Sequence, residues 1–269
     1  MIPWLGPHAP YVDNSAALMK EELAIAKEFG VGIHLHMAVG SEDNELTQRE
    51  YGLTAAQAIE RDGFFENRVH AAHCLDLSDA DIDVFARAPM ASVAHCASAG
   101  LRSGREGICP AVKLRERGVT VALGTDNVAA NNSYDMVSEM RVAGLVASHR
   151  ERKAQVLSSK ALIRMATIDG AKALGLDHEI GSLEPGKSAD FIVVDVNRPG
   201  YSETPDPETL LVYSGSGRDV RDVYVAGEQL VRNRELVRRD YRDIRADYAK
   251  AYATFWARVD EAKRQKAVA

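Results

Sequence analysis

Four short apolar runs in the first half of the chain end in side chains that can bind a metal ion or transfer a proton. A lone histidine on a strand is usually a structural residue, but four polar strand ends in succession rarely arise by coincidence. Neutral imidazole nitrogens and carboxylate oxygens are ligands that a borderline divalent cation such as Zn²⁺ accepts. The pattern therefore indicates a metal site or an acid–base site built from His36, His73, His95 and Asp126.

Helical patterns separate the four apolar runs, which cover residues 31–37, 68–74, 91–96 and 119–126. A helix is predicted before the first run, because Asn14 and Ser15 can cap its start and Gly30 can end it. Short apolar runs that alternate with helices predict βαβ units and a parallel sheet. Ligands of such folds gather at the carboxyl ends of the strands, so we expect the four polar side chains to converge there.

The character of the sequence changes near Gly175. A turn-rich segment over 179–187 is followed by a strong strand over 190–195 and by a hairpin around Ala226 and Gly227. The last part, 241–266, has the pattern of a charged amphipathic helix. We therefore expect two domains, residues 1–175 and residues 176–269.

The composition is that of an ordinary globular protein. The chain has 269 residues, of which 46% are hydrophobic and 27% charged, and its formal net charge is −6, which excludes a disordered or collagen-like chain. The slightly negative net charge gives no sign of a basic surface for binding nucleic acid. No apolar run reaches the roughly 20 residues that a membrane span needs. This charge and the lack of a long apolar run lead us to expect neither a nucleic-acid nor a membrane partner. The three cysteines, Cys74, Cys96 and Cys109, cannot form a complete set of disulfides, so we expect reduced thiols and a cytoplasmic protein.

The motifs around these residues resemble those of a known family. They occur in the order Gly6-Pro7-His8-Ala9-Pro10-Tyr11, His34-Leu35-His36-Met37-Ala38, Ala72-His73-Cys74-Leu75, Val93-Ala94-His95-Cys96 and Ala122-Leu123-Gly124-Thr125-Asp126-Asn127. This order is similar to that of the amidohydrolase superfamily. The resemblance is strongest to the aminohydrolase branch, with its S-adenosylhomocysteine/5-methylthioadenosine deaminases, guanine deaminases and triazine hydrolases, and it extends to about Leu236.

The resemblance implies a role for each candidate residue. His36 matches a metal ligand at the end of barrel strand five, and Asp126 matches the strand-eight carboxylate that binds the metal and takes a proton from its water. His73 matches a catalytic histidine that contacts this water, while His8 and His95 are expected to contact substrate. The implied cofactor is a divalent metal, most of all zinc with iron as an alternative, and the family commonly forms homodimers.

The implied reaction is hydrolysis of a C–N bond in a small nucleobase-, adenosine- or triazine-like ring, of the deamination or dechlorination type. Metal-bound hydroxide would attack the ring carbon that carries the leaving group, because a bound divalent cation lowers the pKa of water toward about 7. A different class of function stays open, namely a catalytically inactive homologue that serves as a binding or oligomerisation module. A dinucleotide-binding protein is disfavoured, since no G-x-G-x-x-G or P-loop pattern follows a strand.

Three departures from the family pattern bear on these expectations. The metal-binding H-x-H of strand one has no counterpart, since His34 and His36 belong to a later strand. We therefore expect an incomplete (β/α)₈ barrel of strands four to eight, a partial β-sandwich and weak metal binding. Val39 occupies the position of a glutamate that protonates the ring in many deaminases, which puts ring deamination in doubt. The usual Pro-x-Ser-Asn after strand seven is replaced by the segment 97–100.

Overall fold

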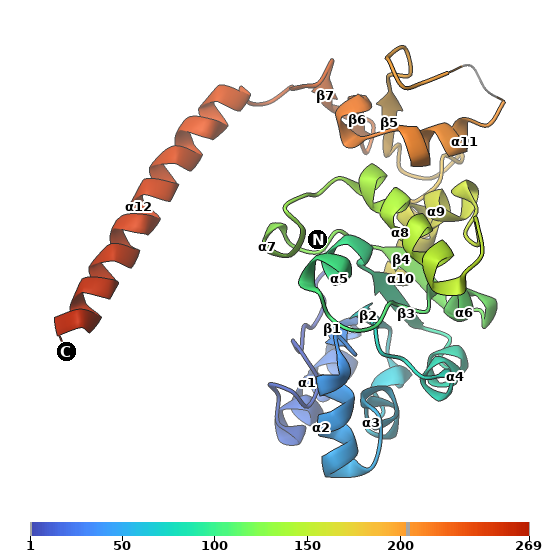
Figure 1. The fold of residues 1–269 in the computed structure, drawn as a ribbon, viewed down its shortest axis with the longest axis vertical. Coiled ribbons are helices and arrows are strands. Elements are labelled where there is room, and N and C mark those ends of the chain that lie inside the picture. Colours follow the sequence, from blue (N-terminus) through green and yellow to red (C-terminus); the bar gives the residue numbers. More distant parts are fainter. Residues whose placement is uncertain (1, 203–204, 269) are drawn as a thin grey trace. The chain divides into compact units, whose positions relative to one another are not determined.

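The computed structural model of the chain describes residues 2–202 and 205–268 (Figure 1). Their contacts divide them into two compact units. The first contains the residues up to Lys187 together with those from Asn197 to Gly217, and the second contains Ser188–Val196 and the residues from Arg218 onward. The first unit continues beyond Gly175 because the following turn packs on a helix, where a Cβ at Gly181 would lie 2.9 Å from the Cα of Ile168.

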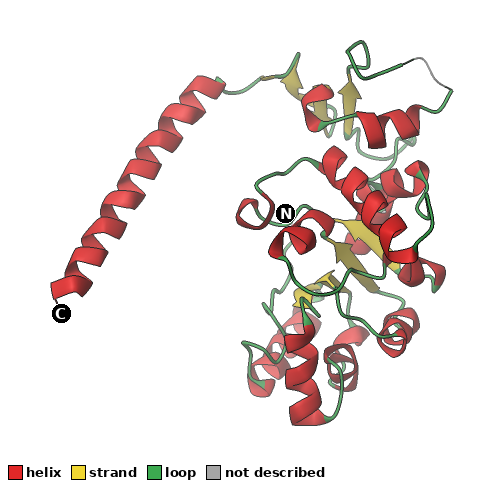
Figure 2. Ribbon diagram, in the orientation of Figure 1, coloured by secondary structure: helices red, strands yellow, loops and turns green. Residues whose placement is uncertain are grey.

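A four-stranded parallel sheet forms the centre of the first unit (Figures 1 and 2). Its strands are β1 (Ile33–Met37), β2 (Val69–His73), β3 (Ala91–His95) and β4 (Thr120–Leu123), in that order. Leu5 forms an additional parallel bridge to Ile33. The prediction of an α/β fold with a parallel sheet is confirmed, because every neighbouring pair in this sheet is parallel.

Helices precede, connect and follow these strands, as Figure 2 shows. They are α1 (Ala16–Phe29), α2 (Ser41–Tyr51), α3 (Ala55–Arg61), the turn η1 (Phe64–Glu66), α4 (Asp79–Arg87), α5 (Ala97–Ser103), α6 (Ala111–Glu116), α7 (Val128–Asn131), α8 (Met136–Glu151), α9 (Ser159–Ala166) and α10 (Ile168–Leu174). The predicted caps of α1 are present, since Ser15 accepts the Leu18 N–H and Gly30 ends the helix in the left-handed conformation.

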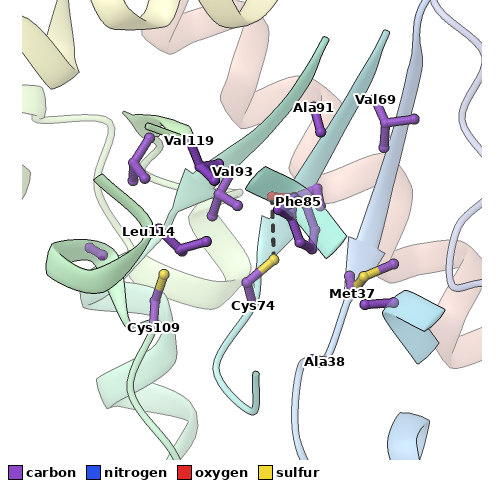
Figure 3. Close-up of a cluster of buried hydrophobic side chains, with 14 of the residues drawn as sticks. Met37, Ala38, Val69, Cys74, Phe85, Ala91, Val93, Cys109, Leu114 and Val119 are labelled. Carbon is purple, nitrogen blue, oxygen red and sulfur yellow. Dashed lines mark hydrogen bonds between the residues drawn. The ribbon is translucent and has the colours of Figure 1, made fainter. Parts of the chain in front are cut away.

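The hydrophobic core lies on one face of the parallel sheet. Successive strand residues point to opposite faces, so Val69 and Val93 enter the core whereas His70 and Ser92 lie on the other face. Figure 3 shows Val69, Val93 and Phe85 in this cluster, with the Cys74 sulfur aimed at the Ala71 carbonyl oxygen at 3.8 Å. The opposite face carries small and polar residues, among them His34, His36, Ala72 and Ala94.

Shorter elements complete the two units. The first unit also contains α11 (Pro207–Thr209) and the π-helical turn η2 (Leu210–Ser214), and η3 (Gly217–Asp219) follows. The second contains the antiparallel strands β5 (Phe191–Val194), β6 (Val220–Val225), β7 (Glu228–Arg232) and β8 (Glu235–Leu236), and the helix α12 (Tyr241–Val268). Ala226 and Gly227, both with positive φ, form the predicted hairpin turn. No helix within the described residues is long and apolar enough to cross a membrane.

Candidate active site

A cavity of about 680 Å³ opens at the carboxyl ends of the parallel strands. Its wall contains four of the residues that the sequence analysis selected, namely His8, His36, His73 and Asp126. They come from the segment before α1, from the ends of β1 and β2, and from the loop after β4. Groups that lie far apart in the sequence therefore meet where an α/β fold normally binds its ligand.

The imidazole of His36 is held by the backbone of the segment before α1. Its Nδ1 lies 2.8 Å from the carbonyl oxygen of His8, which can only accept, so Nδ1 carries the proton. The same carbonyl accepts the backbone N–H of His36 at 2.9 Å. This arrangement leaves Nε2 with a free lone pair, which is the form in which histidine binds a metal.

The ring of His73 stacks on the ring of His36 and faces Asp126. The two ring centroids are 5.3 Å apart with an interplanar angle of 11°, and His73 Nε2 is 3.9 Å from Asp126 Oδ2. Burial and the neighbouring His36 lower the pKa of His73, and the charge of Asp126 offsets part of this effect. His73 is therefore a neutral imidazole at neutral pH, able to donate or accept one hydrogen bond at Nε2.

The carboxylate of Asp126 is oriented by the residue that follows it. Asn127 donates its backbone N–H to Asp126 Oδ1 at 2.6 Å and its side-chain amide to the same oxygen at 3.2 Å. Because both donors bind Oδ1, the other oxygen, Oδ2, is available on the side of His73. Asp126 can therefore bind a cation or accept a proton there.

The backbone at the ends of β1, β2 and β4 is strained. Ala38, His73, Cys74 and Asp126 all have positive φ, between 45° and 74°. Residues other than glycine rarely adopt this conformation, and it costs of order 1–3 kcal/mol where packing enforces it. Two of these four residues, His73 and Asp126, line the cavity, so the strained conformation occurs where candidate site residues face it.

His8 and His95, the two predicted substrate contacts, lie in different environments. His8 lines the cavity, pairs through Nδ1 with Asp13, and packs its ring edge on His36 with a centroid distance of 4.6 Å. His95 is only 1% exposed and is not among the residues that line the cavity. Burial lowers the pKa of His95 to about 4, and its Nδ1 has no hydrogen-bond partner within the described part of the chain. The predicted contact between His95 and substrate therefore stays a prediction, and the absence of His95 from the residues that line the cavity does not support it.

Four charged residues of the cavity wall were not selected from the sequence: Glu42, Asp43, Arg102 and Arg105. Glu42 and Asp43 lie in the first turn of α2, and the arginines lie in and just after α5. The available signal was the acidic pair two residues after Gly40, at the start of a polar segment. That signal predicts a helix start better than it predicts a ligand site.

The described residues provide part of a metal site. His36 Nε2 and the Asp126 carboxylate are suitable donors, but no group of three histidine, cysteine or carboxylate residues with metal-binding geometry occurs in the described ranges. A catalytic zinc ion normally has three protein ligands. The thiols do not complete the set, since Cys96 and Cys109 are buried and burial raises the pKa of each to about 12.

Comparison with known proteins extends these observations. A model of the amidohydrolase family matches residues 1–230. The chain is 39% identical over 245 residues to a 5-methylthioadenosine/S-adenosylhomocysteine deaminase of Teredinibacter turnerae, covering 91% of this chain and 54% of that protein. The chain thus spans about half the length of the curated relatives it matches.

Two crystal structures have a fold similar to that of this chain. An adenosine deaminase from Xanthomonas campestris with bound zinc has a TM-score of 0.89 at 31% identity, covering 94% of this chain and 57% of that one. An atrazine chlorohydrolase from Arthrobacter aurescens in complex with zinc has a TM-score of 0.83 at 28% identity, covering 91% and 54%.

Proposed function

This chain belongs to the amidohydrolase family, and we propose that it provides part of the active site of a metal-dependent hydrolase. The reaction is hydrolysis at a ring carbon of a nucleobase-, adenosine- or triazine-like ring, with cleavage of a non-peptide C–N bond in deamination or of a C–Cl bond in dechlorination. The observation that carries this proposal is the meeting of His36, His73 and Asp126 on the wall of one cavity. The names of the deaminase and chlorohydrolase relatives support the substrate class.

The parallel sheet is, on this proposal, a section of a (β/α)₈ barrel. Leu5 and its bridge to β1 mark barrel strand four, and β1 to β4 are strands five to eight. The antiparallel strands β5 to β8 are part of a β-sandwich. The parallel order of the strands and the TM-scores to family members support this assignment.

His36 and Asp126 are the residues that would hold the metal, with zinc as the first choice and iron as the alternative. Such a metal lowers the pKa of a bound water toward about 7. The remaining ligands would come from outside the described residues, because these offer only two. Zinc in two related structures supports the choice of metal.

Asp126 and His73 handle the proton and the developing charge. Asp126 Oδ2 accepts a proton from the attacking water, since its other oxygen is already engaged by Asn127. Neutral His73, 3.9 Å away, is placed to donate a hydrogen bond to the oxygen that adds to the ring. Positioned proton transfer of this kind contributes about 10²–10⁴-fold to the rate.

The decisive experiment measures turnover with metal supplied. The purified chain, reconstituted with Zn²⁺ or Fe²⁺, is assayed for ammonia release from adenosine and S-adenosylhomocysteine and for chloride release from atrazine. Because the described residues offer only two metal ligands, we expect turnover only at a large excess of metal. Asp126→Asn reduces this turnover by about 10²–10⁴-fold, by loss of the proton acceptor, while circular dichroism stays unchanged. Full activity of Asp126→Asn contradicts the assignment, and absence of both bound metal and turnover favours the inactive binding-module alternative.

A further inference from the structure

A second aspartate on the cavity wall has no role in the reaction as proposed above. Asp43 lies in the first turn of α2, just beyond the carboxyl end of β1. It lines the same cavity as His36, His73 and Asp126 but is only 6% exposed. A buried carboxyl group in a candidate active site requires an explanation, because burial without a countercharge is costly.

The three carboxyl groups of the cavity wall have different surroundings. The side chain of Glu42 is 70% exposed and lies 3.5 Å from the guanidinium of Arg105. Asp126 accepts two hydrogen bonds from Asn127 and faces His73. Asp43 makes no ion pair within the described residues, and the N–H of Val39 lies 3.4 Å from its Oδ2.

These surroundings favour the neutral form of Asp43. Burial raises its pKa, the charge of Glu42 adds to the shift, and the backbone N–H groups of Val39 and Ala38 oppose it only in part. The titratable neighbour on the adjacent strand end, Cys74, is fully buried and uncharged. The two arginines of the cavity wall have other partners: Arg105 pairs with Glu42, and Arg102 donates to the Ala129 carbonyl oxygen and the Asn132 side chain. Asp43 and Asp126 thus lie in one cavity in different surroundings, since Asp43 is buried without an ion pair while Asn127 orients Asp126. Two carboxyl groups in such different surroundings are typical of an acid and a base.

We propose that Asp43 is the acid of this cavity and donates its proton to a ring nitrogen of the substrate, next to the carbon that the water attacks. The inference rests on the proposed function and narrows its substrate class. The substrate is a heteroaromatic ring with a nitrogen adjacent to the carbon that carries the leaving group.

The protons balance over one turnover of an amine substrate. Water gives one proton to Asp126 and its oxygen forms the new C–O bond, while Asp43 gives its proton to the ring nitrogen. When the C–N bond breaks, the amine takes the proton from Asp126 and departs as ammonia. The new hydroxyl group returns its proton to Asp43 as it becomes a carbonyl, so both residues regain their starting states.

A purely structural role is the competing explanation, and the fold provides a matched control for it. Asp81 occupies the same position in α4, the third residue of the helix after β2, and is 1% exposed. It accepts the backbone N–H of Ser78 at 2.9 Å and the hydroxyl of Thr54, and it does not line the cavity. Asp81 is thus a buried helix-start aspartate with a structural role alone.

The test compares Asp43→Asn with Asp81→Asn in the full chain. Asparagine keeps a carbonyl oxygen that accepts the Val39 N–H but cannot donate a carboxyl proton. We expect Asp43→Asn to lower kcat for adenosine by about 10²–10⁴-fold and to remove the fall in rate at alkaline pH. Asp81→Asn lowers stability and leaves kcat of the folded protein unchanged. A kcat of Asp43→Asn equal to wild type overturns the proposal.

A second measurement does not depend on turnover. Carboxyl ¹³C NMR of the aspartate-labelled chain, with Asp43→Asn for assignment, follows the titration of Asp43 with and without adenosine. We expect a midpoint above that of the exposed aspartates and a further change on adding adenosine. A midpoint at or below the exposed aspartates, or no response to adenosine, overturns the inference. If both expected NMR results appear in a chain without turnover, the proposed function fails while the ring contact of Asp43 stands.

Discussion

Two histidine pairs on the same two strands have nearly the same geometry. His36 and His73 stack with a centroid distance of 5.3 Å, and His34 and His70, one step further from the strand ends, stack at 5.2 Å. In both pairs the β1 histidine uses Nδ1 to bind a backbone carbonyl oxygen at 2.8 Å. Residue type, strand and ring stacking therefore do not distinguish the pair that lines the cavity from the pair that does not.

The difference lies in what surrounds the second ring of each pair. His73 faces the cavity and Asp126. His70 is buried, and its Nδ1 lies 2.8 Å from the hydroxyl oxygen of Ser92, whose own proton goes to the Val69 carbonyl at 3.2 Å. His70 Nδ1 must therefore donate. We call His34 and His70 the inner pair and His36 and His73 the outer pair. The inner pair joins a hydrogen-bonded chain across β1, β2 and β3, while the outer pair lines the cavity.

The largest expected effect separates the two β1 histidines. His36→Gln removes a proposed metal ligand. Loss of a residue that only supports a ligand lowers metal affinity by up to about a hundredfold, so loss of a ligand itself should lower zinc affinity by more than that, and turnover should fall with it. His34→Gln, two residues earlier on the same face, should leave both within a few-fold. Zinc affinity is measured by competition with a chromogenic chelator. Equal losses in the two variants contradict the division into an outer and an inner pair.

The next effect concerns the pH dependence of stability. Burial, with a smaller contribution from His34, lowers the pKa of His70 to about 4, against about 6.5 in the unfolded chain. Between these values the unfolded chain binds a proton that the folded chain does not. Stability is therefore lost as the pH falls from about 6.5 to about 4, by roughly 3 kcal/mol for this residue.

His70→Gln should remove this loss. Urea unfolding at several pH values between 7.5 and 4 measures the free energy of unfolding of both proteins. The variant should show a shallower fall with decreasing pH, with a remainder from buried His95, whose pKa is also lowered to about 4. Parallel curves for variant and wild type would show that His70 is not kept neutral by burial.

Much of the fold follows from sequence patterns, and the candidate site follows only in part. The four apolar runs are strands, and the hairpin at Ala226 and Gly227 is present. Strand alternation explains why His95 is buried, since it shares a face with Val93. The same alternation would bury His73 beside Ala71, but its φ of 74° turns it to the cavity. No pattern in the sequence predicts this strained backbone conformation at His73.

Asp43 was missed for a different reason. Helix α2 is almost entirely polar, with only Asp43 and Thr47 buried, and it begins after Gly40 without a side-chain cap. Apolar periodicity is the main sequence signal of a helix, and this segment lacks it. A carboxyl group in such a segment is normally solvated, so its burial against the cavity becomes visible only once tertiary packing is known.

The smallest expected effect tests the hydrogen-bonded chain of the inner pair. Ser92 is 2% exposed, and Ser92→Ala leaves the Nδ1–H of His70 buried without an acceptor. Such a group costs about 1–3 kcal/mol, so the free energy of unfolding should fall by about that amount, as measured by urea denaturation. The control is Thr120→Val, at the register partner of Ser92 on β4. Within the described residues the Thr120 hydroxyl has no hydrogen-bond partner, so this variant should lose less free energy of unfolding. Turnover of folded Ser92→Ala should match wild type, since neither Ser92 nor the inner pair, His34 and His70, lines the cavity. If Ser92→Ala lost as much turnover as His36→Gln, the inner pair would instead be needed to position the outer pair, His36 and His73.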